Sequence, residues 1–211
     1  MIPAFPVYLF DVDGTLLDSA PDICGAIQEV LAGTRVGVLP EEFLRGYIGR
    51  HFLELFRDVL PEAEPEEVER LIAEYRRIYP ARGHANTRVY PGVKEGLARL
   101  PGLKATATIK GTPTTRAVLE KFGLLEHFHH VQGTDGFPPK PEPDVILASL
   151  AALGAKPEDC LMVGDSPSDM EAGRRAGAKI CAVRYGYGKV EDLRRFDPDF
   201  WIDDLRELAP A

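Results

Sequence analysis

The sequence predicts an α/β protein with a doubly wound parallel sheet and an all-helical segment inserted after the first strand. Short apolar runs alternate with helical patterns along most of the 211 residues, which is typical of parallel sheets covered by helices. Residues 20 to about 85 break this alternation and show helical periodicity alone. The length allows one sizeable core together with a small second domain.

Six short runs have the composition of buried strands. The first, VYLFD at 7–11, is apolar up to its final aspartate. The others are, in chain order, KATATI (104–109), HHVQG (129–133), CLMVGD (160–165), KICAVRY (179–185) and DFWID (199–203). Helical stretches such as PTTRAVLEKFG and PEPDVILASLAALG separate the later runs.

The helical segment contains three apolar stripes at helical spacing. They are Ile23, Ala26, Ile27, Val30 and Leu31; Phe52, Leu55, Phe56 and Val59; and Leu71, Ile72, Tyr75 and Ile78. The stretch ARGHANTRVYPG at 81–92 is the expected return linker. We therefore predict a helical domain at residues 17–86 and a discontinuous α/β core at residues 1–16 and 87–211.

The amino-acid composition limits where the protein can be located in the cell and which partners it can bind. The net charge of −8 without a basic cluster disfavours nucleic acid and acidic membranes as partners. The sequence shows no apolar run long enough to span a membrane and no signal peptide. Three scattered cysteines argue for the reducing cytoplasm and against disulfides or a zinc site.

Acidic residues follow two of the predicted strands. Asp11 and Asp13 end the first strand in VYLFDVDG, and Asp165 ends the strand at 160–165. Ligands of open α/β sheets bind at the carboxyl ends of the strands, so the three carboxylates converge if these strands are neighbours. Their repulsion can be relieved by raised pKa values or by a hard divalent cation, and oxygen ligands favour Mg²⁺. A simple acidic turn after a strand is the other interpretation of DVDG.

Three further residues can complete such a site. Thr108, in TATIKGTPTT, is either a β-branched strand residue or a hydroxyl donor to a phosphoryl oxygen. Lys140, in FPPKPEPD, is either a solvated lysine or the positive charge that a phosphate site needs. Asp169, in DSPSD, has the position of the N3 acid of a capping box that begins at Ser166, and it can also support a metal ion.

These residues resemble the motifs of the haloacid dehalogenase superfamily, in particular the phosphoglycolate phosphatase-like branch with a helical cap. The four motifs, in chain order, are DVDGTLLDS, Thr108, Lys140 in KPEPD, and GDSPSD. The resemblance covers nearly the whole chain and implies a Rossmann-like core with the helical domain as a cap. At the second motif the family often has Thr-Asn-Lys, whereas this chain has Thr-Ile-Lys at 108–110.

The resemblance implies a role for each residue. Asp11 would be the nucleophile that forms an aspartyl-phosphate, and Asp13 the general acid and base. Thr108 and Lys140 would hold the transferring phosphoryl group. The Mg²⁺ site would consist of Asp11, Asp13 through its backbone carbonyl, and Asp165, with Asp169 in support.

In the same family a loop of the cap reads the leaving group of the substrate. The corresponding stretch here is YIGRHF at 47–52, which breaks a helical pattern at Gly49 and presents Arg50 and His51. A solvated surface arginine is the other interpretation of Arg50.

The expected function is therefore a cytoplasmic, Mg²⁺-dependent phosphatase of a small phosphorylated metabolite, such as phosphoglycolate. An inorganic pyrophosphatase or a β-phosphoglucomutase-like phosphotransferase could use the same core. A catalytically silent ligand-binding module is the alternative outside enzymes. The absence of GxGxxG after the first strand disfavours a dinucleotide-binding protein.

Overall fold

The computed structural model describes residues 2–208; Met1 and residues 209–211, which the predicted core includes, lie outside the described residues. The chain forms two compact units, one of Met1–Asp18 with Arg88–Ala211 and one of Ser19–Thr87. The domain boundaries at 16–17 and 86–87, and the role of the helical unit as a cap, stay predictions.

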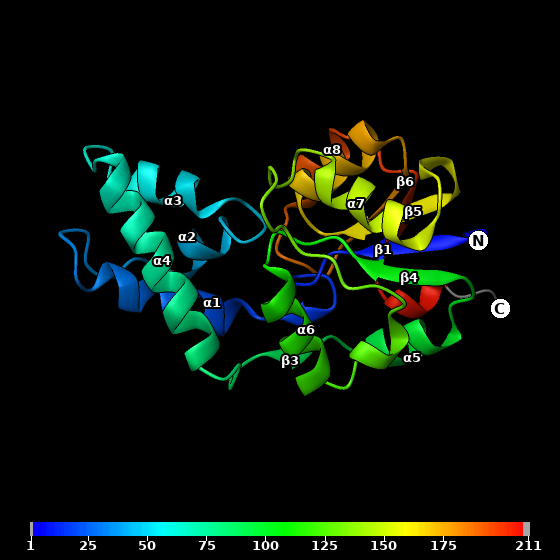
Figure 1. Ribbon diagram of the computed structural model, residues 1–211, viewed down its shortest axis with the longest axis horizontal. Helices are drawn as coiled ribbons and strands as arrows, with labels where there is room; N and C mark the ends of the chain where they lie inside the picture. The colour runs from blue at the N-terminus through cyan, green and yellow to red at the C-terminus, as the bar shows by residue number, and fades with distance from the viewer. Residues whose placement is uncertain (1, 209–211) are drawn as a thin grey trace. The chain divides into compact units, whose positions relative to one another are not determined.

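The α/β unit is built on a parallel sheet with strand order β4-β1-β5-β6-β7. From β1, an interior strand next to the edge strand β4, the chain continues to β4 on one side and later to β5 on the other, so the predicted doubly wound sheet is confirmed (Figure 1). The strands are β1 (Val7–Phe10), β4 (Leu103–Thr106), β5 (Cys160–Gly164), β6 (Lys179–Val183) and β7 (Phe200–Ile202). A two-stranded antiparallel pair, β2 (Leu17–Asp18) and β3 (Arg88–Val89), joins the two segments of this unit.

Helices cover both faces of the sheet, as parallel strands require. They are α5 (Val93–Arg99), α6 (Thr112–Lys121), α7 (Asp144–Leu153), α8 (Pro167–Ala176) and α9 (Val190–Arg194), with the 3-10 helices η1 (Leu125–His127), η2 (Pro157–Asp159) and η3 (Leu205–Leu208).

The alternation of side chains along β1 explains its continuous apolar run. Tyr8 and Phe10 pack with α5, α6 and η3 on one face of the sheet. Val7 and Leu9 pack with α7, α8 and α9 on the other face. Because both faces are buried, every position of the strand is apolar until the chain leaves the sheet at Asp11.

One predicted strand is wrong. Residues 129–133 make only isolated bridges to the sheet edge, Ala105 with His130 and Thr108 with Gly133. Between the bridges, the Thr106 hydroxyl donates to Gln132 O at 2.9 Å and accepts from Gln132 N at 2.8 Å. A side chain thus replaces the backbone partner that a continuous ladder would need, and the β propensity of the segment does not reveal this.

The helical unit contains α1 (Ala20–Leu31), α2 (Glu41–Arg45), α3 (Phe52–Val59) and α4 (Pro65–Ala81). The three predicted apolar stripes lie on α1, α3 and α4, and most of their side chains are buried. Among the described residues of the whole chain, no helix combines the length and the apolar character needed to cross a bilayer.

Asp22, in the first turn of α1, ties the two ends of the helical unit together. Its carboxylate is fully buried and accepts hydrogen bonds from Asn86 N (2.9 Å) and from the Thr87 hydroxyl (2.8 Å). Burial raises the pKa of Asp22, but the hydrogen bonds from Thr87 and Asn86 outweigh it and keep this pKa below its usual value. The ionised carboxylate therefore stabilises the fold.

We expect Asp22→Ala to lower the free energy of unfolding by about 2–4 kcal/mol, because buried donors lose a charged acceptor. Since the pKa of Asp22 is lower in the folded than in the unfolded chain, its contribution is present above about pH 4 and fades as the pH falls further. Urea denaturation at pH 7 and at pH 3 measures both effects. Asp22→Asn, which keeps an acceptor oxygen, should lower the free energy of unfolding less than Asp22→Ala does. Equal unfolding midpoints for wild type and Asp22→Ala at pH 7 would contradict this role.

Candidate active site

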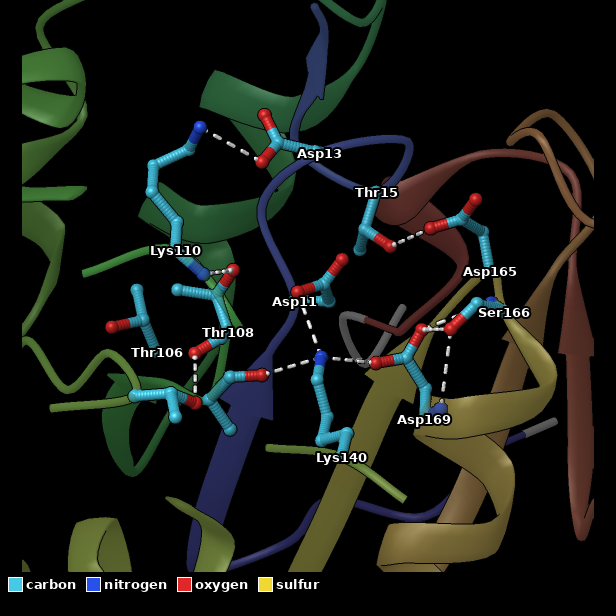
Figure 2. Close-up of polar contacts among 12 residues, drawn as sticks. Asp11, Asp13, Thr15, Thr106, Thr108, Lys110, Lys140, Asp165, Ser166 and Asp169 are labelled. Atoms are coloured by element: carbon cyan, nitrogen blue, oxygen red, sulfur yellow. Dashed lines mark hydrogen bonds and ion pairs between the residues drawn. The ribbon is translucent and has the colours of Figure 1, made fainter. Parts of the chain in front are cut away.

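The predicted site residues of the α/β unit gather at the carboxyl edge of the central strands. Asp11 follows β1, Thr108 lies two residues beyond β4, and Asp165 follows β5. Because β1 lies between β4 and β5, these strand ends are adjacent. Figure 2 shows the side chains of the three strand ends around Lys140 and Asp169.

Lys140 is the centre of this cluster. Its side chain is 1% exposed, and its ammonium group donates to Asp11 Oδ1 at 2.8 Å and to Asp169 Oδ1 at 2.5 Å. A third hydrogen bond, of 2.9 Å, goes to the carbonyl of Ala107. Burial lowers the pKa of Lys140, but the carboxylates of Asp11 and Asp169 outweigh it and hold this pKa above its usual value. The lysine is therefore a fixed positive charge.

One lysine does not neutralise the carboxylates around it. Burial raises the pKa of Asp11 to about 6; Lys140 opposes the rise, and the charges of Asp169 and Asp13 add to it. Burial also raises the pKa of Asp165 well above its usual value, and the carboxylates of Asp169 and Asp11 add to this rise. Burial is the main cause of both rises, and the neighbouring carboxylates add to it, so a further positive charge would stabilise the ionised forms of Asp11 and Asp165.

Asp169 has the capping position predicted for it. Its Oδ2 accepts from Ser166 N at 2.9 Å, and its own N–H donates to Ser166 Oγ at 3.2 Å, which completes the capping box of α8. The other carboxylate oxygen accepts from Lys140. The structural interpretation of Asp169 is thus confirmed, and its role beside a metal ion stays a prediction.

The hydrogen-bond partners of the Asp165 carboxylate were not predicted from the sequence. The Thr15 hydroxyl donates to Oδ1 at 2.9 Å, and Tyr187 N donates to Oδ2 at 2.8 Å. The loop that carries Tyr187 approaches Asp165 closely, since a Cβ on Gly186 would overlap its side chain and a Cβ on Gly188 its carbonyl oxygen. The glycines of YGYG at 185–188 are the only sequence signal of this contact.

Thr108 lies beside the acid cluster and is buried. Its hydroxyl accepts from Lys110 N at 3.3 Å, which leaves the hydroxyl hydrogen able to donate elsewhere. The backbone amides after Thr108 were also expected to bind a phosphoryl oxygen. One of them is already occupied, because Thr112 N at the start of α6 donates to the Asp135 carboxylate at 3.1 Å. The hydroxyl is therefore the stronger candidate donor to a ligand.

Asp13 is held by a lysine that sequence analysis treated only as part of an altered motif. Lys110 Nζ lies 3.0 Å from Asp13 Oδ2, with both side chains largely buried. The turn after Asp13 requires Gly14, whose φ is +92° and where a Cβ would overlap the Asp165 carboxylate. The presence of Lys110 in the second motif was the available signal.

The donor set of the cluster fits a hard divalent cation. Carboxylate oxygens of Asp11, Asp165 and Asp169 lie within 4.8 Å of one another, and all three residues are buried. Two oxygens of Asp165 and one of Asp11 are fixed by hydrogen bonds, so a cation would meet oriented ligands. Oxygen ligands together with unneutralised negative charge are what Mg²⁺ selects.

Arg50 and His51 belong to the helical unit, whereas the residues above belong to the α/β unit. His51 is the N-cap of α3, and its ring Nδ1 accepts from Leu53 N at 3.2 Å. Arg50 lies 4.0 Å from Glu54 and over the ring of Tyr47. Both residues thus have local structural contacts, and their role in substrate choice stays a prediction.

Comparisons with known proteins agree on one family. A family model described as haloacid dehalogenase-like hydrolase matches residues 8–183. A phosphoglycolate phosphatase of Nitrosospira multiformis is 35% identical over 210 residues, which cover 95% of this chain and 92% of the relative. Phosphoglycolate phosphatase 1 of Pseudomonas aeruginosa is 35% identical over 213 residues, which cover 96% of this chain and 78% of the relative.

Solved structures share the fold over nearly the whole chain. A protein from Clostridium acetobutylicum, described as a predicted phosphatase, superposes with a TM-score of 0.89 at 27% identity and covers 98% of this chain and 97% of its own. A haloacid dehalogenase-like family protein from Streptococcus pneumoniae has the same TM-score at 24% identity, with 97% and 96% covered. The similarity to the Streptococcus pneumoniae protein concerns the fold alone.

We expect Gly188→Ala to displace Asp165, because the added Cβ would overlap the Asp165 carbonyl oxygen. The protein should lose about 1–3 kcal/mol of stability through this overpacking. It should also gain less thermal stability from Mg²⁺ than the wild type, since ligand binding stabilises only an intact site. Melting curves over a Mg²⁺ titration measure both effects.

Gly33→Ala in the helical unit is the matched control, because its Cβ would make only ordinary contact with Val30 O at 3.8 Å. A wild-type melting temperature and Mg²⁺ response in Gly188→Ala would show that the loop does not constrain Asp165.

Proposed function

The chain belongs to the haloacid dehalogenase-like hydrolases and is a phosphoric monoester hydrolase; from this premise we propose that it hydrolyses a small phosphorylated metabolite with Mg²⁺ and an aspartyl-phosphate. The observation that carries the proposal is the buried Lys140 ammonium, 2.8 Å from Asp11. A carboxylate that attacks a phosphate ester needs fixed positive charge between the two anions, and Lys140 supplies it.

The substrate that we propose first is 2-phosphoglycolate. The relatives that cover most of this chain are named phosphoglycolate phosphatases. Such a substrate agrees with the expectation of a small phosphorylated metabolite, whereas no observation favours the pyrophosphatase or the mutase. The cytoplasmic location and the absence of nucleic acid and membrane partners stay predictions.

In the first step, a carboxylate oxygen of Asp11 attacks phosphorus and the bond from phosphorus to the ester oxygen breaks. Asp13 gives its proton to the departing oxygen, which leaves as an alcohol. Asp13 lies two residues after Asp11 in the turn beyond β1, so one strand end carries both groups. Lys140 and the Thr108 hydroxyl bind the phosphoryl oxygens as their charge shifts.

In the second step, Asp13 takes a proton from water, and the water oxygen attacks the phosphorus of the aspartyl-phosphate. The bond from phosphorus to Asp11 breaks, which releases inorganic phosphate and restores the carboxylate. The covalent intermediate divides one difficult displacement into two easier ones.

The proposed ligands of Mg²⁺ are Asp11, the backbone carbonyl of Asp13, and Asp165, with Asp169 in support. When bound, the ion neutralises charge on the phosphoryl group and on the nucleophile. Thr15 and Tyr187 hold the Asp165 carboxylate in place. Lys140 and the Ser166 cap hold Asp169.

Activity should depend on Mg²⁺. We expect hydrolysis of 2-phosphoglycolate and of p-nitrophenyl phosphate to stop with EDTA and to return with Mg²⁺. Ca²⁺ should restore it poorly, because that ion accepts more ligands in a looser geometry. Initial rates over a titration of each metal measure this. Full activity in metal-free buffer would contradict the metal assignment.

The two aspartates should fail in different ways. Asp11→Asn should abolish turnover, because an amide does not form the acyl-phosphate. Asp13→Asn keeps the nucleophile and the backbone carbonyl but loses proton transfer, which is typically worth ~10²- to 10⁴-fold. In Asp13→Asn, the rate of the first step should fall more for alkyl esters than for nitrophenyl esters, because nitrophenolate leaves without a proton.

Pre-steady-state kinetics with both ester types separates these roles. Slow dephosphorylation in Asp13→Asn should give a burst of one nitrophenolate per enzyme. Equal losses for alkyl and aryl esters without a burst would remove Asp13 from acid–base catalysis. Steady turnover by Asp11→Asn would remove Asp11 as the nucleophile.

A further inference from the structure

The acid cluster carries a second lysine that the proposed chemistry does not use. Lys110 Nζ lies 3.0 Å from Asp13 Oδ2, and its side chain is 8% exposed. Figure 2 shows Lys140 beside Asp11 and Lys110 beside Asp13, so each lysine accompanies a different aspartate. The phosphoryl-binding charge is Lys140, and Lys110 lies by the residue that faces the leaving group.

The backbone around Lys110 fixes where its side chain begins. Its N–H donates to Thr108 Oγ1 at 3.3 Å, and its carbonyl accepts from Thr134 N at 3.2 Å. The Thr115 hydroxyl donates to the same carbonyl at 3.4 Å. A Cβ on Gly133 would overlap this oxygen, so the two chain segments are in close contact. These contacts fix the backbone of Lys110, which suits a side chain that must hold its ammonium group in one position.

We propose that Lys110 binds a negative charge on the alcohol part of the substrate and so selects phosphate esters of small hydroxy acids. This inference rests on the proposed function, in which Asp13 contacts the oxygen that leaves. Lys110 therefore determines specificity, and its ammonium group contacts the substrate carboxylate.

The dimensions agree with this contact. A general acid lies about 3 Å from the oxygen that it protonates. With Lys110 Nζ 3.0 Å from Asp13, the ammonium lies within roughly 6 Å of the leaving oxygen. In an ester of a 2-hydroxy acid, the carboxylate oxygens lie about 3 Å from the ester oxygen, given ordinary bond lengths. An ammonium and a carboxylate on the same side of the leaving oxygen thus come within hydrogen-bonding distance.

The charge of the site favours such a lysine beside an anionic leaving group. The chain has a net charge of −8, and in the proposed mechanism the reacting ester lies beside Asp11 and Asp13 and near Asp165. A carboxylate on the leaving group would meet this negative field at short range, where low dielectric strengthens repulsion. Lys110 offsets that repulsion at the one place where the extra charge arrives.

The test compares 2-phosphoglycolate with 2-hydroxyethyl phosphate, in which an uncharged hydroxymethyl group replaces the carboxylate. We expect the wild type to prefer 2-phosphoglycolate. Lys110→Met should reduce kcat/KM for 2-phosphoglycolate on the order of 10- to 100-fold more than for the neutral ester. Much of the difference should appear in KM, because the carboxylate is charged before and during reaction. Lys110→Arg should keep the preference.

Equal losses for both esters in Lys110→Met would overturn the inference, because a residue that only positions Asp13 affects both alike. A wild type that hydrolyses both esters without preferring the carboxylate would also overturn it and leave the phosphatase proposal intact. A wild type that hydrolyses neither ester nor p-nitrophenyl phosphate would overturn the proposed function together with the inference.

Two controls separate charge from fold. Lys179→Met removes a lysine that pairs with Asp199 at 2.9 Å on the surface and should leave both rates unchanged. Lys110→Gln, a polar variant, should lose the preference as Lys110→Met does if either remains folded by its melting curve. Retention of the wild-type preference in a folded Lys110→Gln counts against the inference.

Discussion

The arrangement at the carboxyl edge of the sheet depends on one buried ammonium group. Lys140 joins Asp11 at the end of β1, the carbonyl of Ala107 beyond β4, and Asp169 at the start of α8. An unpaired buried carboxylate is costly, and two of them in contact are costlier still. Three separate elements therefore share one cation, which fixes their strand and helix ends relative to one another.

Most residues of the candidate site could be predicted from the sequence because they have unusual positions. An aspartate at the end of an apolar strand, as at Asp11 and Asp165, has no role in the packing of that strand. The strands themselves could be predicted because burial on both faces gives uninterrupted apolar runs. The resemblance to the haloacid dehalogenase superfamily, based on four motifs in order, is confirmed by the family model.

The rest depends on contacts that leave little trace in a sequence. Tyr187 acts on Asp165 through its backbone N–H, which any residue but proline could supply. Thr15 reaches Asp165 from far away in the chain, and only the fold brings them together. The strand expected at 129–133 was wrong because the Thr106 side chain takes the hydrogen bonds that a ladder would use. Lys110 was noted in the second motif, but its ion pair with Asp13 could not be predicted from the sequence.

The insertion of the helical unit after β1 also determines when the site can form during synthesis. Lys140 is 129 residues from Asp11, and Thr15 is 150 residues from Asp165. Contacts of such high sequence separation form late and slow folding. On the ribosome, β1 emerges first. Lys140 is made only after about two thirds of the chain, and β5, the second neighbour of β1, is made later still, so Asp11 gains these partners late. A nascent chain that stops earlier contains Asp11, the proposed nucleophile, but lacks Lys140 and Asp165.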